Sequence, residues 1–458
     1  MKRCCWPSAV LPTYLLVVLL LALAASGEVI PRCGDRQLSQ EEVEAQSGIV
    51  EASAAKRQAL MQSTSKRTVL HAFQQQQRAR AVNDYLDTYT LLTLDIPINY
   101  YVVHHEDGTG YVEEAMLEAQ TAVMNDRFAS PIDTGLRFHT NATVYINDTS
   151  LAMLCGHRRQ FIAARYVILD GRDPAESLNV LVCRSRRFLG VAVFPWEAPE
   201  DDALQSINLH PGSLPGGYVA DFNEGDTLVH EAGHYFGLFH VFEGTTCSRR
   251  RGDFIRDTAA QKYPTSGCPS PEESADTCPH RRGHDNIHNY MDYSTDACID
   301  RFTRWQVVYM RYYTEYFRPR LSNAALVVEA SSATCTDLGW QPADGVVGAN
   351  GRGVCAESRV GSGDQCLTGD WFDAFFHCQS IGARMCTSDE LMSMDNKGDI
   401  GRCRGLLRNR LVWTTNFCSR ARRAVVRLRR RRPPKMECRP PERQAGTILC
   451  CADDTDTR

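Results

Sequence analysis

The chain has 458 residues, 23% of them charged, and its 51 basic and 55 acidic side chains give a formal net charge of −4. Because the two signs nearly balance, the composition argues against a general nucleic-acid-binding protein, and we expect no nucleic-acid partner. The length is typical of two or three domains.

Residues 1–27 have the three parts of a secretory signal peptide. MKRCCWPS is basic, TYLLVVLLLALAA is apolar, and Ala25, Ser26 and Gly27 are the small residues of a cleavage site. A retained membrane anchor is the alternative, but the apolar run is short and no later stretch could span a bilayer. We expect cleavage after Gly27, no stable membrane insertion, and a secreted, extracellular protein.

Cysteine usage agrees with secretion. Loss of Cys4 and Cys5 with the leader leaves seventeen of the nineteen cysteines, more than a reduced cytosolic chain usually carries. Seventeen is odd, so if the others pair, one thiol is left over, and Cys33 is the candidate. Asn141 and Asn147 lie in glycosylation sequons, which also fits a secreted protein.

Residues 28–90 are rich in Gln, Glu, Ala and Ser and have few large apolar side chains, so we expect a poorly packed pro-segment. Basic residues in polar sequence near its end are the candidate cleavage sites for an activating protease: Lys66, Arg67, Arg78 and Arg80.

The pattern of apolar and polar residues changes at "IPINYYVVHH", where strand-like and helix-like stretches begin to alternate. Apolar runs or period-two alternation predict strands at 96–105, 136–148, 177–184 and 189–195, and helical periodicity predicts a helix over 112–129. This order predicts an α+β (mixed α/β) fold in which helices pack on a mixed sheet.

The motif "LVHEAGHYFGLFH" has the layout of a catalytic zinc site. His230 and His234 lie one helical turn apart and can reach one ion, Glu231 can act on a metal-bound water, and Gly237 lets the chain turn so that His240 becomes a third ligand. Three imidazoles leave a fourth position open. The alternatives are chance core histidines or a site that binds zinc without turnover, but every position that the chemistry needs is filled.

This motif, together with "HNYMDYSTDAC", resembles the metzincin zinc metallopeptidases, and the surrounding sequence resembles their pappalysin-like branch. The resemblance runs from about Ile96 to Phe317, within a peptidase domain placed at 91–322. It implies a twisted mixed sheet, a zinc-binding helix and a helical lower half. It also implies that Met291 forms the methionine turn beneath the zinc and that Tyr293 stabilises the oxyanion, so that peptide bonds are hydrolysed without a covalent intermediate.

The resemblance also implies two disulfides, Cys247 with Cys278 and Cys268 with Cys298, where the sequence alone allows three pairings. Family precedent makes Asp253, Asp257 and Thr258 a candidate calcium site, and a capped turn is the equal alternative.

Asp296 is the candidate for a pocket that accepts the residue following the cut, where relatives often favour Arg or Lys. "PRCGD" resembles a cysteine switch, in which Cys33 would bind the zinc of the latent enzyme; pairing with another cysteine is the alternative.

The run "LGVAVFP" at 189–195 is a candidate edge strand for pairing with an extended substrate, and an ordinary sheet strand is the alternative. The stretch between Cys155 and Cys183 is hard to align with the family. We expect His104, His105 and His288 to be structural.

Residues 330–458 contain ten cysteines and form a separate disulfide-rich module. Trp371, Ala374 and Cys378 have helical spacing, and the pattern resembles a C-type-lectin-like domain, although the calcium-holding sugar-binding tripeptides are not evident. The run from Arg420 to Arg432 could bind an anionic surface polysaccharide, be a processing site, or be a solvated loop.

The sequence therefore predicts a secreted zinc-dependent endopeptidase that is made as a zymogen and acts on protein or peptide substrates. The alternative is a non-catalytic secreted binding protein that acts through its C-terminal module.

Overall fold

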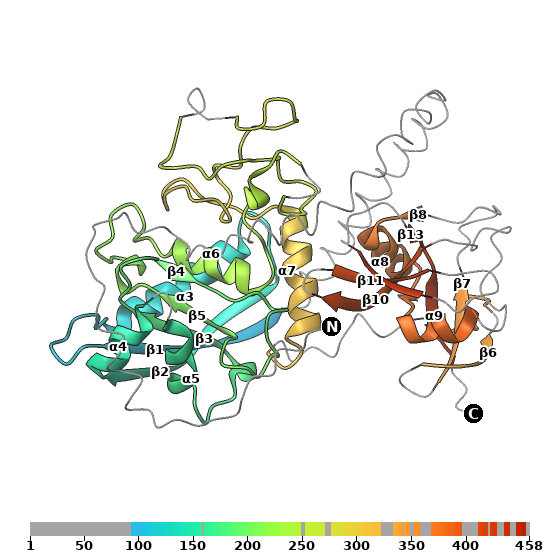
Figure 1. Cartoon of the computed structure of the whole chain (residues 1–458), viewed down its shortest axis with the longest axis horizontal. Coiled ribbons are helices and arrows are strands. Elements are labelled where there is room, and N and C mark those ends of the chain that lie inside the picture. Colours follow the sequence, from blue (N-terminus) through green and yellow to red (C-terminus); the bar gives the residue numbers. More distant parts are fainter. Residues whose placement is uncertain are drawn as a thin grey trace, which may run out of the picture.

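The computed structural model describes residues 93–157, 160–248, 252–270 and 276–321 of the first part of the chain, and eight segments of the C-terminal part. Those segments are 333–340, 342–348, 352–357, 368–395, 411–419, 422–427, 435–439 and 446–454. The expected signal peptide, pro-segment, Cys33 and cleavage positions lie outside the described residues. The two parts lie side by side, with helix α7 between them (Figure 1).

The first part contains a five-stranded sheet with the strand order β2-β1-β3-β5-β4. The first four strands of this order run parallel, and β4 pairs antiparallel with β5 at the edge. The strands are β1 (Leu94–His104), β2 (Leu136–Asn147), β3 (Leu178–Cys183), β4 (Gly190–Val191) and β5 (Ser206–Leu209). The strands predicted near 96, 136 and 177 are confirmed. The strand predicted over 189–195 is shorter, and β5 was not predicted.

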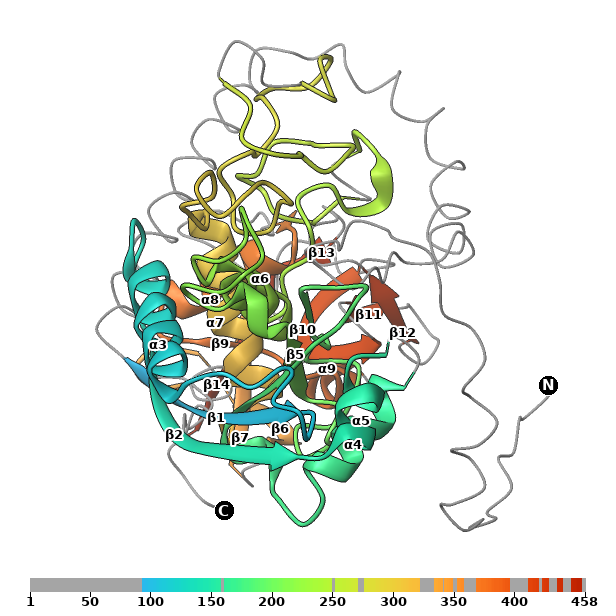
Figure 2. The same ribbon diagram turned by 90° about the vertical axis from the view of Figure 1, so that its left-hand side faces the viewer.

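Helices cover both faces of this sheet, as the predicted mixed α/β fold requires. Because side chains alternate along a strand, Ile98, Tyr100 and Val102 of β1 enter the main core, and Tyr101 and Val103 enter a second core. The main core also holds helices α3 (Glu114–Ala129) and α6 (Asp226–Tyr235), and the second core holds α4 (Thr149–Cys155) and α5 (Phe161–Ile168). Figure 2 shows α4 and α5 together, away from α3.

The stretch that is hard to align with the family forms α5 and the turn η4 (Pro174–Glu176), and α4 comes directly before it. A disulfide between Cys155 and Cys183 ties the end of α4 to the end of β3. This segment is therefore an ordered layer on the sheet. Two further short helices, η5 (Pro211–Ser213) and η6 (Glu243–Thr245), lie before and after α6 in the chain.

The C-terminal part contains one five-stranded and one four-stranded sheet, with the orders β12-β11-β10-β13-β8 and β6-β7-β14-β9. Its helices are α8 (Trp371–Ser380) and α9 (Ser388–Asp395). The strands are β6 (Pro342–Val347), β7 (Gly353–Glu357), β8 (Thr368–Gly369), β9 (Arg384–Met385), β10 (Leu411–Ser419), β11 (Arg422–Arg427), β12 (Lys435–Arg439), β13 (Gly446–Thr447) and β14 (Cys450–Asp453). Its disulfides include Cys335–Cys355, Cys378–Cys450 and Cys386–Cys451.

Aromatic side chains join the two parts along helix α7 (Arg304–Phe317). The ring of Tyr309 stacks on Phe372 of α8 at 4.2 Å between centroids, and Tyr312 meets Trp371 edge to face at 4.8 Å. Beside them, Arg256 forms ion pairs with two carboxylates at the start of α8, those of Asp370 and Asp373. The contact therefore combines apolar packing with a partly buried charge cluster.

None of the described helices combines the length and the apolar character needed to cross a membrane.

Candidate active site

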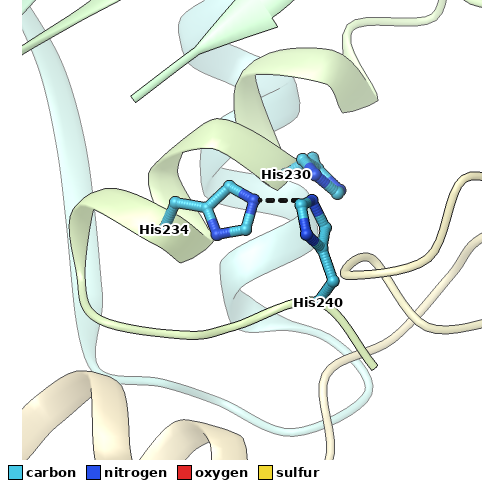
Figure 3. Close-up of side chains that lie close together, drawn as sticks. All are labelled: His230, His234 and His240. Carbon is cyan, nitrogen blue, oxygen red and sulfur yellow. Dashed lines mark hydrogen bonds between the residues drawn. The ribbon is translucent and has the colours of Figure 1, made fainter. Parts of the chain in front are cut away.

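Helix α6 and the turn after it bring three histidines together. His230 and His234 are buried on α6, which ends at Tyr235. Gly237 has a φ of +100°, a left-handed conformation that favours glycine, and an added Cβ there would lie 2.4 Å from the ring of Tyr313. The chain turns at this point and returns His240 to the other two histidines, as the motif predicts (Figure 3).

The histidine rings are oriented so that one nitrogen of each faces a common point. Nδ1 of His230 lies 2.6 Å from the carbonyl oxygen of Tyr290, and Nδ1 of His234 lies 2.7 Å from that of Leu238. A carbonyl can only accept, so each Nδ1 is the donor, and the lone pair of Nε2 points into the site. Nε2 of His234 and Nε2 of His240 are 3.0 Å apart.

These nitrogens suit a metal ion better than a proton. One ligand atom from each histidine lies within 4.8 Å of the others. Burial lowers the pKa of His234 to about 4, and burial together with His234 lowers that of His240, because the interior disfavours the charged form of the ring. Three neutral imidazoles around one point fit zinc, whose tetrahedral sites place nitrogens about 3.3 Å apart.

Glu231 is buried on α6 beside the first histidine, and its side chain lies against strand β4. A Cβ added to Gly190 of β4 would be 2.4 Å from Cγ and 2.6 Å from Oε1 of Glu231. The residue at this position of β4 therefore has to be a glycine for the carboxylate to keep its place. The sequence offered no sign of this contact, because the two residues are far apart in the chain.

The segment that follows β4 runs past the second histidine. The ring of Phe194 meets His234 edge to face at 5.4 Å, and it stacks on Trp196 at 5.0 Å. The "LGVAVFP" run therefore borders the site from Glu231 to His234, whereas only Gly190 and Val191 pair with the sheet.

Met291 packs against α6, and Tyr293 lies beside two of the histidines. An added Cβ on Gly233 of α6 would be 2.3 Å from the Met291 sulfur, so this buried methionine packs directly beneath the helix. The Tyr293 ring lies 5.8 Å from that of His230 and 5.1 Å from that of His240.

Glu243 is a neighbour of the site that sequence reasoning missed. Its Oε2 lies 3.9 Å from Nδ1 of His240, and burial raises its pKa to about 7. The signal in the sequence was its position three residues after His240, which places the two side chains close together after the turn. At 3.9 Å this carboxyl group is too far from Nδ1 of His240 for a hydrogen bond, so Glu243 is an acidic neighbour of the third ring.

The loops between η6 and α7 extend to one side of the first part (Figure 1). They contain the disulfides Cys247–Cys278 and Cys268–Cys298, which are the two pairings that the family resemblance implies. These loops lead from the three histidines to Met291.

The structure brings two of the three candidate calcium ligands together. Thr258 Oγ1 donates to Oδ2 of Asp253 at 2.7 Å, and burial raises the Asp253 pKa to about 7, with further contributions from Asp257 and Glu243. Asp257 instead accepts from the Thr303 hydroxyl and the Trp305 amide at the start of α7. Asp253 also accepts from the Ile255 amide at 3.1 Å, as a capped turn would.

Asp296 is buried, and its Oδ2 accepts a hydrogen bond from the backbone amide of Glu224 at 2.9 Å. Its own amide donates to the carbonyl of Asp221, so it holds the loop that leads into α6.

The histidines expected to be structural lie in other settings: Nδ1 of His104 contacts the carbonyl of His105, and that of His288 contacts the carbonyl of Cys298. Within the described ranges, the histidine cluster formed by residues 230, 234 and 240 is the group suited to hold a metal.

Comparison with known proteins gives similarities that cover this region. The peptidase family described as "Pregnancy-associated plasma protein-A" matches residues 167–315. An "Extracellular metalloprotease" of Pyricularia oryzae is 34% identical over 218 residues, which is 47% of this chain and 72% of that protein. One from Colletotrichum graminicola is 34% identical over 232 residues, 49% of this chain and 78% of that protein. Among solved structures, mature mirolysin of Tannerella forsythia in complex with a cleaved peptide aligns with a TM-score of 0.44 and 25% identity, over 50% of this chain and 96% of that chain.

Proposed function

Since this chain belongs to the pappalysin-like metzincins, a family of metallo-endopeptidases, we propose that it is secreted, that its metal is zinc, and that it is made as an inactive precursor. The observation that carries the choice of zinc is the set of three imidazoles, two buried and one partly buried, two of which donate from Nδ1 to backbone carbonyls. His230, His234 and His240 would hold the ion.

Zinc, when bound, supplies a Lewis acid that polarises the scissile carbonyl and makes a water molecule more acidic. Glu231 then accepts a proton from the attacking water and passes it to the leaving amine. Its burial against Gly190 keeps the carboxylate in one position for both transfers. Tyr293, beside His230 and His240, donates from its hydroxyl to the oxyanion of the tetrahedral intermediate.

The edge strand β4 provides the substrate-binding surface in this proposal. An extended protein or peptide substrate would pair with the open edge of β4, next to Glu231. The buried Asp296 carboxylate would favour Arg or Lys after the cut, because a basic side chain compensates a negative charge in a pocket of low dielectric.

Further parts of the proposal concern regulation and targeting. Cys33, within the pro-segment, would occupy the open position on the zinc until an activating protease removes it. Calcium bound at Asp253 and Thr258 would neutralise a buried carboxylate. The C-terminal module, for which a C-type-lectin-like fold remains our expectation, would bring the enzyme to an anionic surface polysaccharide through its basic run.

The test is casein digestion by the processed protein, with and without a zinc chelator, beside a Glu231→Ala variant. We expect the chelator to abolish digestion, added zinc to restore it, and Glu231→Ala to reduce kcat by about 10³-fold or more while the bound zinc stays near one ion per chain. Digestion unaffected by both changes would contradict the proposal. A protein that digests nothing and carries no zinc would favour the non-catalytic binding protein.

A further inference from the structure

A fully buried arginine lies behind the strand that borders the active site. Arg165 comes from α5, in the stretch that resists alignment with the family, and its exposed fraction is 0%. Its Nε donates to Oδ1 of Asn208 at 2.7 Å, Nη1 to the carbonyl of Leu204 at 3.0 Å, and Nη2 to the carbonyl of Val191 at 3.1 Å. All three acceptors are neutral, and the negative charges of Glu231 and Glu197 only partly offset the cost of burying this guanidinium.

The three acceptors belong to the edge of the sheet. Val191 of β4 stands opposite Asn208 of β5 in the strand register, and Leu204 lies just before β5. The planar guanidinium therefore bridges both strands where β4 ends. Asn208 in turn donates from Nδ2 toward the sulfurs of Cys155 and Cys183, at 3.4 and 3.6 Å. Through Asn208, the arginine thus connects the edge strand to the Cys155–Cys183 disulfide.

The directions of the backbone groups of β4 show which edge of the sheet depends on the hydrogen bonds of Arg165. The Leu189 carbonyl accepts from the His210 amide, and the Val191 carbonyl accepts from Arg165, so both face the interior of the sheet. Backbone groups alternate in direction along a strand, which places those of Gly190 on the open edge. Gly190 is also the residue that contacts Glu231. A shift of β4 would therefore displace the edge available to a substrate.

We propose that Arg165 is a positioning residue that fixes the register of β4 for strand pairing with an extended peptide substrate. The inference rests on the proposed function, because it assumes that peptides bind along β4. Arg165 acts through Val191 and Asn208 and contacts no substrate itself. A lysine cannot replace it, because one ammonium group lacks the planar fork that reaches three acceptors on two strands.

The test compares two substrates of the processed chain. One is an eight-residue peptide that extends well before the cleaved bond, and the other is the same peptide shortened to one residue before that bond. Pairing with β4 can stabilise only the longer peptide. The ratio of the two kcat/KM values therefore measures how much this pairing contributes to hydrolysis. We expect Arg165→Lys, which keeps a positive charge near Glu231, to lower kcat/KM for the long peptide about ten-fold, mostly through KM, and to leave the short peptide within about two-fold. Arg165→Met also removes that charge, so it should lower kcat/KM for both peptides, and more for the long one.

Arg318→Met is the matched control. Arg318 is a second buried arginine, and its hydrogen bonds go to neutral oxygens of Tyr235 and Gln205 instead of β4. We expect this variant to lose stability while its ratio of long to short peptide hydrolysis stays that of the unaltered chain. Zinc content, measured for every variant, should not change.

Several outcomes would overturn the inference. An unaltered ratio in folded Arg165→Lys, or an equal loss for both peptides, would give Arg165 a packing role alone. If Arg165→Met does not fold, Arg165→Lys decides, since it keeps the charge and most of the volume. Unaltered protein that cleaves neither peptide would overturn the proposed function and this inference with it.

Discussion

The contact between Gly190 and Glu231 makes the position of the proposed catalytic carboxylate depend on a residue without a side chain. An alanine Cβ would be 2.4 Å from Cγ of Glu231, closer than two carbon atoms can approach, so Glu231 or β4 has to move. We expect Gly190→Ala to lower kcat about 10- to 100-fold while the bound zinc stays at the level of the unaltered enzyme. Steady-state kinetics and zinc analysis of the purified variant would measure both.

Gly353→Ala is the control for that substitution, because its added Cβ would be 3.4 Å from Asp454, an ordinary contact in the C-terminal part. If Gly190→Ala kept full kcat, the close packing between β4 and Glu231 would have no role in catalysis.

Among single residues, the sequence predicted the three histidines that the structure brings together, but it missed most of the residues that hold the site in place. His230, His234 and His240 share one short motif, so their spacing alone showed that they could meet. Gly190 and Arg165 act through contacts between segments that are distant in the chain, and no local spacing reveals such contacts.

Among the elements, we expect the stability of the loop around Asp253 to depend on pH. The pKa of its carboxyl rises from the ordinary value of 3.8 to about 7 in the folded protein, mainly because it is buried. Between pH 4 and pH 7 the folded protein therefore holds a proton that the unfolded chain has released, so this residue's contribution to stability is lost as the pH rises through about 7.

We expect the Tm of calcium-free protein to fall by about 4 °C or more between pH 5 and pH 8, with a smaller fall in Asp253→Asn. Millimolar calcium should raise the Tm of the unaltered protein at pH 8 and raise that of the variant less, because ionised Asp253 is the proposed ligand. Thermal unfolding followed by circular dichroism would measure this. Equal slopes and no calcium effect would favour the capped turn.

The elements that the sequence predicted are those with a long, regular pattern. β1, β2 and α3 extend over eleven to sixteen residues each, so their periodicity is visible. Strand β5 has four residues, all buried, and β4 has two, so neither shows alternation. Helix α5 buries Arg165 within an otherwise apolar stretch, a charge that a sequence pattern assigns to the surface.

For the whole molecule, the proposed latency depends on Cys33, which lies outside the described residues. If its thiolate occupies the open position on the zinc, a serine in its place binds the metal far less well. We expect the Cys33→Ser precursor to cleave casein before any processing, whereas the unaltered precursor becomes active only after loss of residues 28–90. Gel analysis of the intact precursors would show which chains are active. A silent Cys33→Ser precursor would contradict the cysteine switch.

The packing of Tyr309 and Tyr312 on α8 has a consequence for how the two parts of the chain can be separated. Together with the Arg256 ion pairs, these rings hold the parts by lateral contacts, in addition to the peptide that links residues 321 and 333. Cutting that link would leave a noncovalent heterodimer, and an isolated peptidase half would expose the aromatic face of α7 to water. We therefore expect the C-terminal part to stay bound to the peptidase part after such a cut.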